Sequence, residues 1–190
     1  MLKNSRMLAL GTAAPDFSLP DAGGRVHSLA AIAAGRPVLV AFICNHCPFV
    51  KHLAAGFAKF ASEYQPKGLA VVAITSNDIA SHPDDAPLKM PEFARQHGFS
   101  FPYLYDESQQ VALAYEAICT PDFFMFDAQL KLAYRGQFDS SRPGGRGGVH
   151  DGSDMRAAAD AVLAGRVPTT QVASAGCNIK WKPENEPDWA

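Results

Sequence analysis

Residues 38–50 read VLVAFICNHCPFV, and this stretch decides the fold. Its first part, 38–43, is continuously apolar and rich in branched side chains, which is typical of a parallel strand covered on both faces. The strand leads into a Cys-x-x-Cys motif at 44–47. The apolar residues that follow recur at helical spacing on one stripe: Val50, Leu53, Phe57, Phe60 and Tyr64. The stretch therefore predicts a strand, a dithiol motif and a helix in succession.

Further segments extend this pattern toward the C-terminus. Residues 69–74 (LAVVAI) predict a second buried strand, and 86–97 predict a helix that ends before Gly98. A strand, helix, strand order implies a parallel pair joined by a crossover. Two more helices and a hairpin are expected: 108–117, 153–163, and 123–126 with 130–134. Ser108 and Ser153 are the expected N-caps of these two helices.

Length and composition predict one folded domain. The chain has 190 residues, against about 150 for a typical domain. With 47% hydrophobic and 19% charged residues, it has enough apolar side chains for a core, which excludes extensive disorder. Residues 1–168 are expected to form the domain, with a glycine-rich loop at 136–152. Residues 169–190 show little periodicity and are expected to pack on the domain as a coil tail.

Charge and hydropathy narrow the class of partner. Seventeen basic against nineteen acidic residues give a net charge of −2, so no basic field attracts nucleic acid or an anionic membrane. The apolar runs are far shorter than the roughly 20 residues that span a bilayer. The first residues make a poor signal sequence, and four cysteines are too few for a disulfide scaffold. These features predict a cytoplasmic protein.

Cys44 and Cys47 are the candidate catalytic residues. We expect Cys44 to attack, because unpaired N–H groups and the positive end of the helix dipole favour its thiolate at the helix start. Cys47, about one turn along, is expected to be less exposed and to act as the resolving thiol. Half a zinc site is an alternative, but Cys119 and Cys177 are isolated and offer no second close ligand pair. Two inert core cysteines are the other alternative.

Three segments make the chain resemble the thioredoxin-like superfamily. They are APDFSL at 14–19, CNHCP at 44–48 and Thr-Pro at 120–121. The chain is most similar to bacterial redoxins related to the peroxiredoxins and to TlpA-type thiol-disulfide proteins. Some small members of this group also share a DDAP stretch like 84–87 and a GCxIKW ending like 176–181. The resemblance implies an α/β thioredoxin-like fold, a central mixed β-sheet flanked by helices on both faces.

The resemblance also implies roles for residues around the dithiol. Pro121 would be the family's cis-proline beside the sulfurs, and Thr120 would offer backbone groups to an extended substrate. His46 resembles the third position of the motif in DsbA, where a cationic imidazole would lower the pKa of Cys44 and make the disulfide more oxidising. An exposed His46 with no effect is the alternative.

Three features depart from the related families. Thioredoxins carry a buried acid in the strand before the motif, but 38–43 contains no carboxylate, so the proton acceptor for Cys47 is unassigned. Peroxiredoxins place a threonine three residues before the reactive cysteine, where this chain has Ala41. They also carry an arginine shortly before the hairpin, where this chain has Thr-Pro-Asp at 120–122. Both peroxiredoxin differences count against peroxidase activity.

These observations predict a thiol-disulfide oxidoreductase acting through Cys44 and Cys47. Its partners would be protein or small-molecule disulfides and a thiol reductant or reductase, with no metal and no organic cofactor required. Cys119 and Cys177 are possible accessory thiols, although core filling is the preferred interpretation of Cys119. The alternatives are a peroxiredoxin-like thiol peroxidase and a redox-sensing binding module without catalysis. The oligomeric state is left open.

Overall fold

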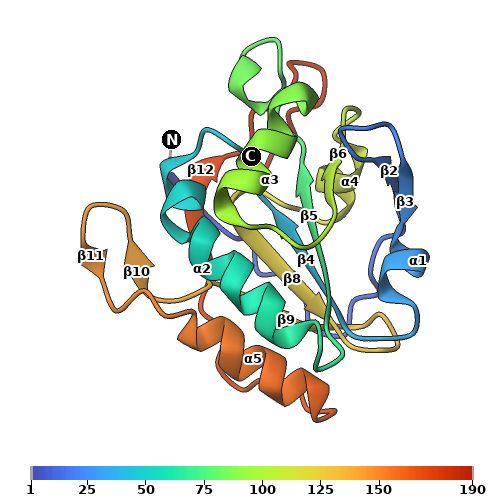
Figure 1. The fold of residues 1–190 in the computed structure, drawn as a ribbon, viewed down its shortest axis with the longest axis vertical. Coiled ribbons are helices and arrows are strands. Elements are labelled where there is room, and N and C mark those ends of the chain that lie inside the picture. Colours follow the sequence, from blue (N-terminus) through green and yellow to red (C-terminus); the bar gives the residue numbers. More distant parts are fainter. Residues whose placement is uncertain (1, 190) are drawn as a thin grey trace.

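A mixed five-stranded sheet forms the centre of the computed structural model, which describes residues 2–189 (Figure 1). The strand order is β6-β5-β4-β8-β9. Strands β4, β5 and β6 are parallel, whereas β8 and β9 pair antiparallel, as expected. The bounds are β4 Val38–Phe42, β5 Ala70–Thr75, β6 Tyr103–Tyr105, β8 Asp122–Phe126 and β9 Leu132–Arg135.

Helices cover both faces of the sheet. One face packs against α2, α3 and α5, and the other against α1 and α4. Strand β4 is buried throughout because its side chains alternate between the two cores, which explains its continuous apolar run. The bounds are α1 Leu29–Ala33, α2 Pro48–Tyr64, α3 Met90–His97, α4 Gln110–Ala114 and α5 Ser153–Leu163. Over residues 2–189, no helix combines the length and apolarity needed to cross a membrane.

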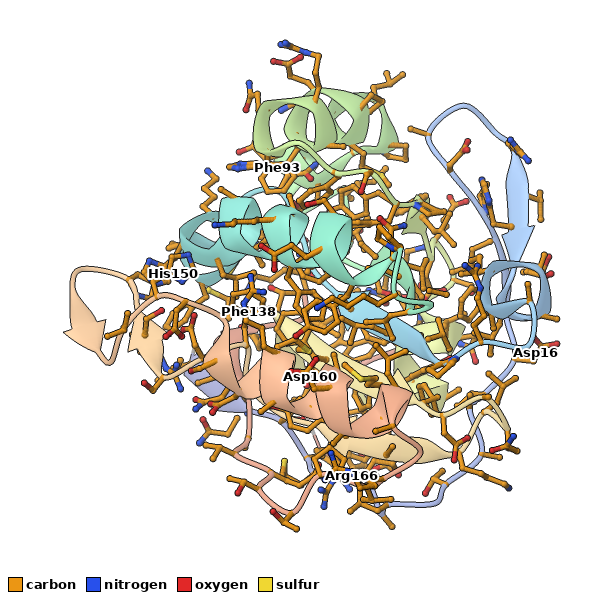
Figure 2. All side chains as sticks on the ribbon, turned by 60° about the horizontal axis from the view of Figure 1, so that its bottom comes forward. Asp16, Phe93, Phe138, His150, Asp160 and Arg166 are labelled. Atoms are coloured by element: carbon orange, nitrogen blue, oxygen red, sulfur yellow. The ribbon has the colours of Figure 1, made fainter. Side chains whose placement is uncertain are left out.

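The core on the α2 side is dominated by aromatic rings. Phe57 of α2 is fully buried and lies within 6.3 Å of the rings of Phe123 and Phe138. Figure 2 shows Phe93 and Phe138 beside α2. This packing fixes the orientation of α2, and therefore the place where its N-terminus meets the end of β4.

Several expected boundaries are corrected. The helix expected at 86–97 is instead a short 3-10 helix, Pro87–Lys89, followed by α3, and a further 3-10 helix, Pro83–Asp85, precedes it; the prolines lack the N–H groups of a regular helix. The segment expected as loop at 136–152 contains a small hairpin, β10 (Ser141–Arg142) with β11 (Arg146–Gly147).

Both expected serine N-caps are wrong. Helix α4 begins after Gln109, which has a positive φ of 63°, and Ser108 lies one residue further out. Helix α5 has Gly152 as its N-cap, with φ of 67°, and a Cβ there would lie 2.6 Å from the Phe138 ring. Serine is a favoured N-cap residue, which led to both predictions. The helix starts are instead set by the positive φ angles of Gln109 and Gly152 and, at Gly152, by the nearby Phe138 ring.

A separate three-stranded sheet pairs a strand near the N-terminus, a strand near the C-terminus and the short strand that immediately precedes β8. Its order is β1-β12-β7, with β1 Leu2–Asn4, β12 Ala175–Asn178 and β7 Cys119–Thr120. The expectation of a coil tail over 169–190 is therefore wrong at β12. Long-range pairing creates this strand, because its sequence Ala-Gly-Cys-Asn has little intrinsic preference for β structure. A shorter hairpin, β2 Ser18–Pro20 with β3 Val26–Ser28, lies near β6.

Candidate active site

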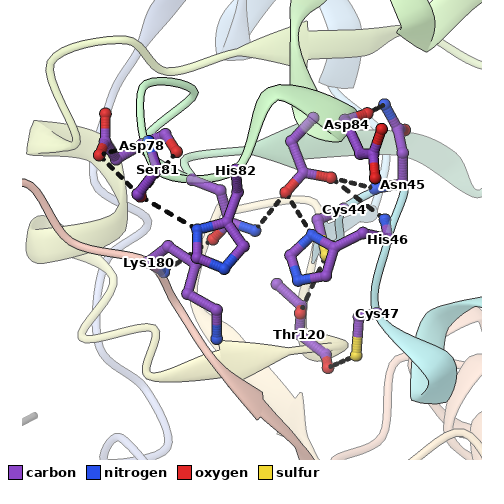
Figure 3. A network of polar contacts seen from close by, with 12 residues as sticks. Cys44, Asn45, His46, Cys47, Asp78, Ser81, His82, Asp84, Thr120 and Lys180 are labelled. Atoms are coloured by element: carbon purple, nitrogen blue, oxygen red, sulfur yellow. Dashed lines mark hydrogen bonds and ion pairs between the residues drawn. The ribbon is translucent and has the colours of Figure 1, made fainter.

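The dithiol motif lies at the carboxyl end of β4, where the chain turns into α2 (Figure 3). Cys47 is the N-cap of α2, and Cys44 lies three residues earlier. The sequence had suggested an earlier helix start, with Cys44 near the N-cap and Cys47 about one turn into the helix. Both side chains are 0% exposed, so Cys44 is not the more accessible of the two.

Thr120 contacts both sulfurs of the motif. Its hydroxyl oxygen lies 3.3 Å from Cys44 Sγ, and its carbonyl oxygen accepts a 3.1 Å hydrogen bond from the Cys47 thiol. The Thr120–Pro121 peptide bond is cis, as the family resemblance implied. The two residues expected beside the dithiol are therefore there. However, the Thr120 backbone already pairs with Cys177 of β12 instead of presenting a free edge.

Cys177 brings a third thiol to the site. Strand β12 places it opposite Thr120, and its side chain packs against the core cluster that contains Cys47. It is partly exposed, whereas Cys119, also on this sheet, is fully buried. The Cys119 thiol lies against the Pro121 carbonyl at 3.5 Å. Of the two possible accessory thiols, Cys177 lies opposite Thr120 beside the dithiol, whereas Cys119 is buried against the Pro121 carbonyl.

The three thiols have different tendencies to ionise. The neighbouring Cys44 thiol lowers the pKa of Cys47 to about 4, despite burial, and the Cys177 thiol and the Val50 backbone N–H contribute. Burial raises the pKa of Cys44 well above its ordinary range, and the neighbouring Cys47 and the charge of Asp85 add to this. The Thr120 carbonyl accepts a hydrogen bond from the Cys47 thiol and therefore favours its protonated form, but several neighbouring groups have the opposite effect on its pKa. Cys47, the N-cap, is therefore the sulfur that the surroundings favour as thiolate.

A buried carboxylate, Asp85, holds the motif loop. It accepts hydrogen bonds from the backbone N–H groups of Asn45 at 2.7 Å and His46 at 3.2 Å, and from the Asn77 amide at 2.8 Å. Burial alone would raise the pKa of Asp85, but these bonds and His46 lower it below its ordinary value. The buried Tyr103 hydroxyl donates to the Asn45 side chain at 3.0 Å. The DDAP stretch was noted only as a mark of resemblance, and its role as a clamp was missed.

His46 does not act as an isolated cation. Its Nδ1 lies 2.6 Å from an Asp85 carboxylate oxygen, and its ring stacks on His82 at 4.9 Å between centroids (Figure 3). Asp85 therefore offsets any positive charge that His46 carries near Cys44. The expected effect of His46 on the Cys44 thiolate is correspondingly reduced.

Three groups at the site could hold a metal ion. Ligand atoms of Cys44, His46 and Asp85 lie within 4.8 Å of one another. Sulfur, imidazole and carboxylate are all zinc ligands. However, His46 Nδ1 is engaged by Asp85 at hydrogen-bond distance, so an ion between them would have to replace that contact. The arrangement favours an organised dithiol over a metal centre.

Asp122 is a buried acid that sequence reasoning missed. It is the first residue of β8, directly after Pro121, and is 0% exposed. Burial raises its pKa to about 7, although the nearby Ser5 and the Ile118 N–H, which donates to Asp122 Oδ2 at 3.3 Å, partly oppose this. Its charge also raises the pKa of Cys119. A carboxylate beginning the otherwise apolar DFFMF strand was the available signal.

Replacing Asp122 with asparagine is expected to remove a pH dependence of folding. The folded chain keeps the Asp122 proton up to about pH 7, whereas the unfolded chain loses it near the ordinary value of 3.8. Wild-type stability therefore falls as pH rises across this window, by up to about 4 kcal/mol, and the amide should not show this loss. Urea unfolding across the window measures it, with the exposed Glu107→Gln variant as control. Parallel pH curves for wild type and Asp122→Asn would contradict the assignment.

Replacing Asp85 with asparagine is expected to lower the pKa of Cys44, because the Asp85 charge raises it. The same change weakens the carboxylate bonds to the motif loop and should cost about 2 kcal/mol at neutral pH. Because the folded-state pKa of Asp85 is lowered, its stabilisation is present above the ordinary Asp range and is lost as pH falls. Thiolate ultraviolet absorbance and urea unfolding measure both effects. The neighbouring exposed Asp84→Asn is the control, and equal behaviour of the two variants would refute the clamp.

Comparison with known proteins gives a family and a fold. The sequence pattern of the AhpC/TSA family matches residues 10–135. The solved structure of a hypothetical protein from Sinorhizobium meliloti 1021 is 51% identical with a TM-score of 0.91, covering 95% of this chain and 98% of that chain. The thioredoxin domain of a thiol-disulfide oxidoreductase from Bacteroides vulgatus has a TM-score of 0.60 at 16% identity, covering 78% of this chain and 96% of that chain. These likenesses confirm the thioredoxin-like fold.

Curated relatives bear two kinds of name. Chloroplastic peroxiredoxin Q of Oryza sativa subsp. japonica is 33% identical over 53% of this chain and 43% of its own length. The thiol-disulfide oxidoreductase ResA of Geobacillus thermodenitrificans is 28% identical over 66% of this chain and 67% of its own length. This chain thus spans less than half the length of the peroxiredoxin Q relative. The two names divide between peroxide and disulfide chemistry, so the site must distinguish them.

Proposed function

The chain belongs to the AhpC/TSA family, and we propose that within it the protein is a thiol-disulfide oxidoreductase that works through Cys44 and Cys47. One observation carries this proposal. Both sulfurs lie at the junction of β4 and α2, and both contact Thr120 beside the cis peptide bond to Pro121. Two adjacent thiols with opposite shifts in pKa provide a nucleophile and a second thiol to resolve the product.

The electrostatics favour an order of reaction opposite to the one expected from sequence. The Cys47 thiolate attacks a sulfur of the substrate disulfide, and a mixed disulfide forms while the first substrate thiolate leaves. Cys44 then attacks the Cys47 sulfur and closes the Cys44–Cys47 disulfide, and the second substrate sulfur takes the Cys44 proton and leaves as a thiol. The substrate disulfide gains two electrons, and the two thiols of the chain lose them.

Peroxidase activity is a second candidate, favoured by the similarity to peroxiredoxin Q. The position of the peroxiredoxin threonine is held here by Ala41, a fully buried residue packed in the same core as Cys44 and Cys47. A methyl group cannot donate a hydrogen bond to peroxide. Disulfide exchange therefore has the better support.

The proposal extends to partners and compartment. Disulfides of proteins or small molecules would be the substrates, with a thiol reductant or a reductase to renew the dithiol. A reducing compartment such as the cytoplasm would keep the four cysteines available for exchange. Since β12 covers the Thr120 backbone, small disulfides and flexible, exposed protein disulfides fit this site better than an extended strand.

The deciding experiment is equilibration of the protein in glutathione buffers, with the disulfides mapped by mass spectrometry. We expect one Cys44–Cys47 disulfide, with a reduction potential between about −270 mV, as in thioredoxin, and about −120 mV, as in DsbA. Reduction of glutathione disulfide and consumption of hydrogen peroxide are measured in parallel. Rapid peroxide turnover without exchange would support the peroxidase. Oxidation without turnover of either substrate would support a redox sensor.

A further inference from the structure

We propose that Cys177 is a third redox-active thiol, which passes the substrate disulfide from the surface to Cys47. This inference rests on the proposed function and specifies the route by which substrate enters. It assigns to β12 the place that an incoming substrate strand would otherwise occupy. Three features carry it: the burial of the dithiol, the register of β12, and the contact between Cys177 and Cys47.

Burial of both sulfurs restricts direct attack on a substrate by the dithiol. Cys44 and Cys47 are both 0% exposed. Thiol-disulfide exchange requires the attacking sulfur to approach a substrate sulfur closely, so a buried pair needs either an opening motion or an accessible intermediary. Of the cysteines at the site, only Cys177 is partly exposed.

The register of β12 fixes the position of Cys177 relative to the dithiol. Cys177 pairs with Thr120, the residue whose carbonyl contacts the Cys47 thiol. The preceding Gly176 lies so close that an added Cβ would be 2.1 Å from the Thr120 oxygen. The backbones can approach this closely only because residue 176 has no side chain. On its other edge β12 pairs with β1, so the strand is held from both sides.

The chemistry of the three sulfurs suits a relay with Cys47 at its centre. The Thr120 carbonyl contacts the Cys47 thiol, Thr120 pairs with Cys177 across the strands, and Cys47 is the sulfur favoured as thiolate. Burial, with the neighbouring Cys47, raises the pKa of Cys177 to about 11, so Cys177 keeps its proton at neutral pH. Exchange at Cys177 should therefore accelerate as pH rises above neutral.

The relay balances in three exchanges. The Cys177 sulfur attacks the substrate disulfide, forms a mixed disulfide and releases the first substrate thiol, which takes the Cys177 proton. The Cys47 thiolate attacks the Cys177 sulfur, forms a Cys47–Cys177 disulfide and releases the second substrate thiolate. Cys44 attacks the Cys47 sulfur, and its proton passes to the released Cys177. The chain ends with a Cys44–Cys47 disulfide and a protonated Cys177, and one substrate disulfide has become a thiol and a thiolate.

The test compares Cys177→Ala and Cys177→Ser with the matched control Cys119→Ala. Each reduced protein is mixed with glutathione disulfide, and the rate of Cys44–Cys47 disulfide formation is followed across neutral to alkaline pH. Both Cys177 variants should react at least about tenfold more slowly and lose the alkaline acceleration, because access limits exchange at buried thiols. The Cys44–Cys47 reduction potential should change little, and Cys119→Ala should match wild type.

A trapping experiment completes the test. Mild oxidation of Cys44→Ser should leave a Cys47–Cys177 disulfide, identified by peptide mapping. Absence of that disulfide, or wild-type rates in both Cys177 variants, would overturn the relay while leaving a wild-type Cys44–Cys47 disulfide as support for the proposed function. Failure of the wild-type protein to form a Cys44–Cys47 disulfide at all would overturn the proposed function and the relay together.

Discussion

Replacing Cys47 with serine is expected to abolish disulfide exchange, with a loss of turnover of at least about a thousandfold. Cys47 is the N-cap of α2 and the sulfur that its surroundings favour as thiolate. A serine hydroxyl keeps the size and the hydrogen bond to the Thr120 carbonyl, but it is not ionised at neutral pH and cannot form a disulfide. Turnover of glutathione disulfide with a reductant measures the loss, and the buried Cys119→Ser is the control.

Ultraviolet thiolate absorbance can show which of Cys44 and Cys47 is ionised. Cys47→Ser should lose the thiolate that titrates at about pH 4, whereas Cys44→Ser should keep a thiolate at neutral pH. The opposite result, a thiolate that survives in Cys47→Ser and vanishes in Cys44→Ser, would return the nucleophile to Cys44. It would also show that the Thr120 carbonyl outweighs the donors around Cys47.

Replacing Gly176 with alanine is expected to have the largest effect on stability. The new Cβ would lie 2.1 Å from the Thr120 carbonyl oxygen and 3.0 Å from the Pro121 nitrogen, and both neighbours are backbone atoms that cannot rotate away. Relief requires β12 to move from β7, so we expect a loss of about 3 kcal/mol in the free energy of unfolding. Urea unfolding of the reduced protein measures it.

Gly23 provides the control for this substitution. A Cβ at Gly23 would meet only the Asp21 side chain at 3.3 Å, and its backbone is not in the left-handed region. Gly23→Ala should therefore change stability by less than about 0.5 kcal/mol. If Gly176→Ala is equally mild, β12 does not press against Thr120 as closely as described. If β12 is displaced as expected, the thiols of the Gly176→Ala variant should react faster with alkylating reagents than those of the wild type, because the dithiol is uncovered.

The strongest local patterns in the sequence predicted the framework of the site. The apolar run at 38–43, the motif after it and the stripe on the next helix specify β4, the dithiol and α2, because buried strands and helices have distinct periodicities. The cis bond before Pro121 was implied by the family resemblance, since composition alone would favour trans.

The electrostatics and the third thiol depend on contacts between distant parts of the chain. Asp85 reaches the motif from a short 3-10 helix, and Asp122 becomes significant only when burial raises its pKa. Cys177 approaches Cys47 because β12 inserts between β1 and β7, a pairing that no periodicity in Ala175–Asn178 indicates. Such placements arise from tertiary packing, which overrides weak local preferences.

The pairing of β12 with β7 has a consequence for biosynthesis. Cys47 leaves the ribosome about 130 residues before Cys177, and at about 10 residues per second this interval lasts on the order of 10 s. During that time a nascent chain carries its dithiol without the covering strand. A newly made molecule is therefore most open to cellular oxidants, or to capture by other thiol proteins, before residue 178 emerges. Once β12 has paired with β7, the dithiol is covered and less open to such reactions.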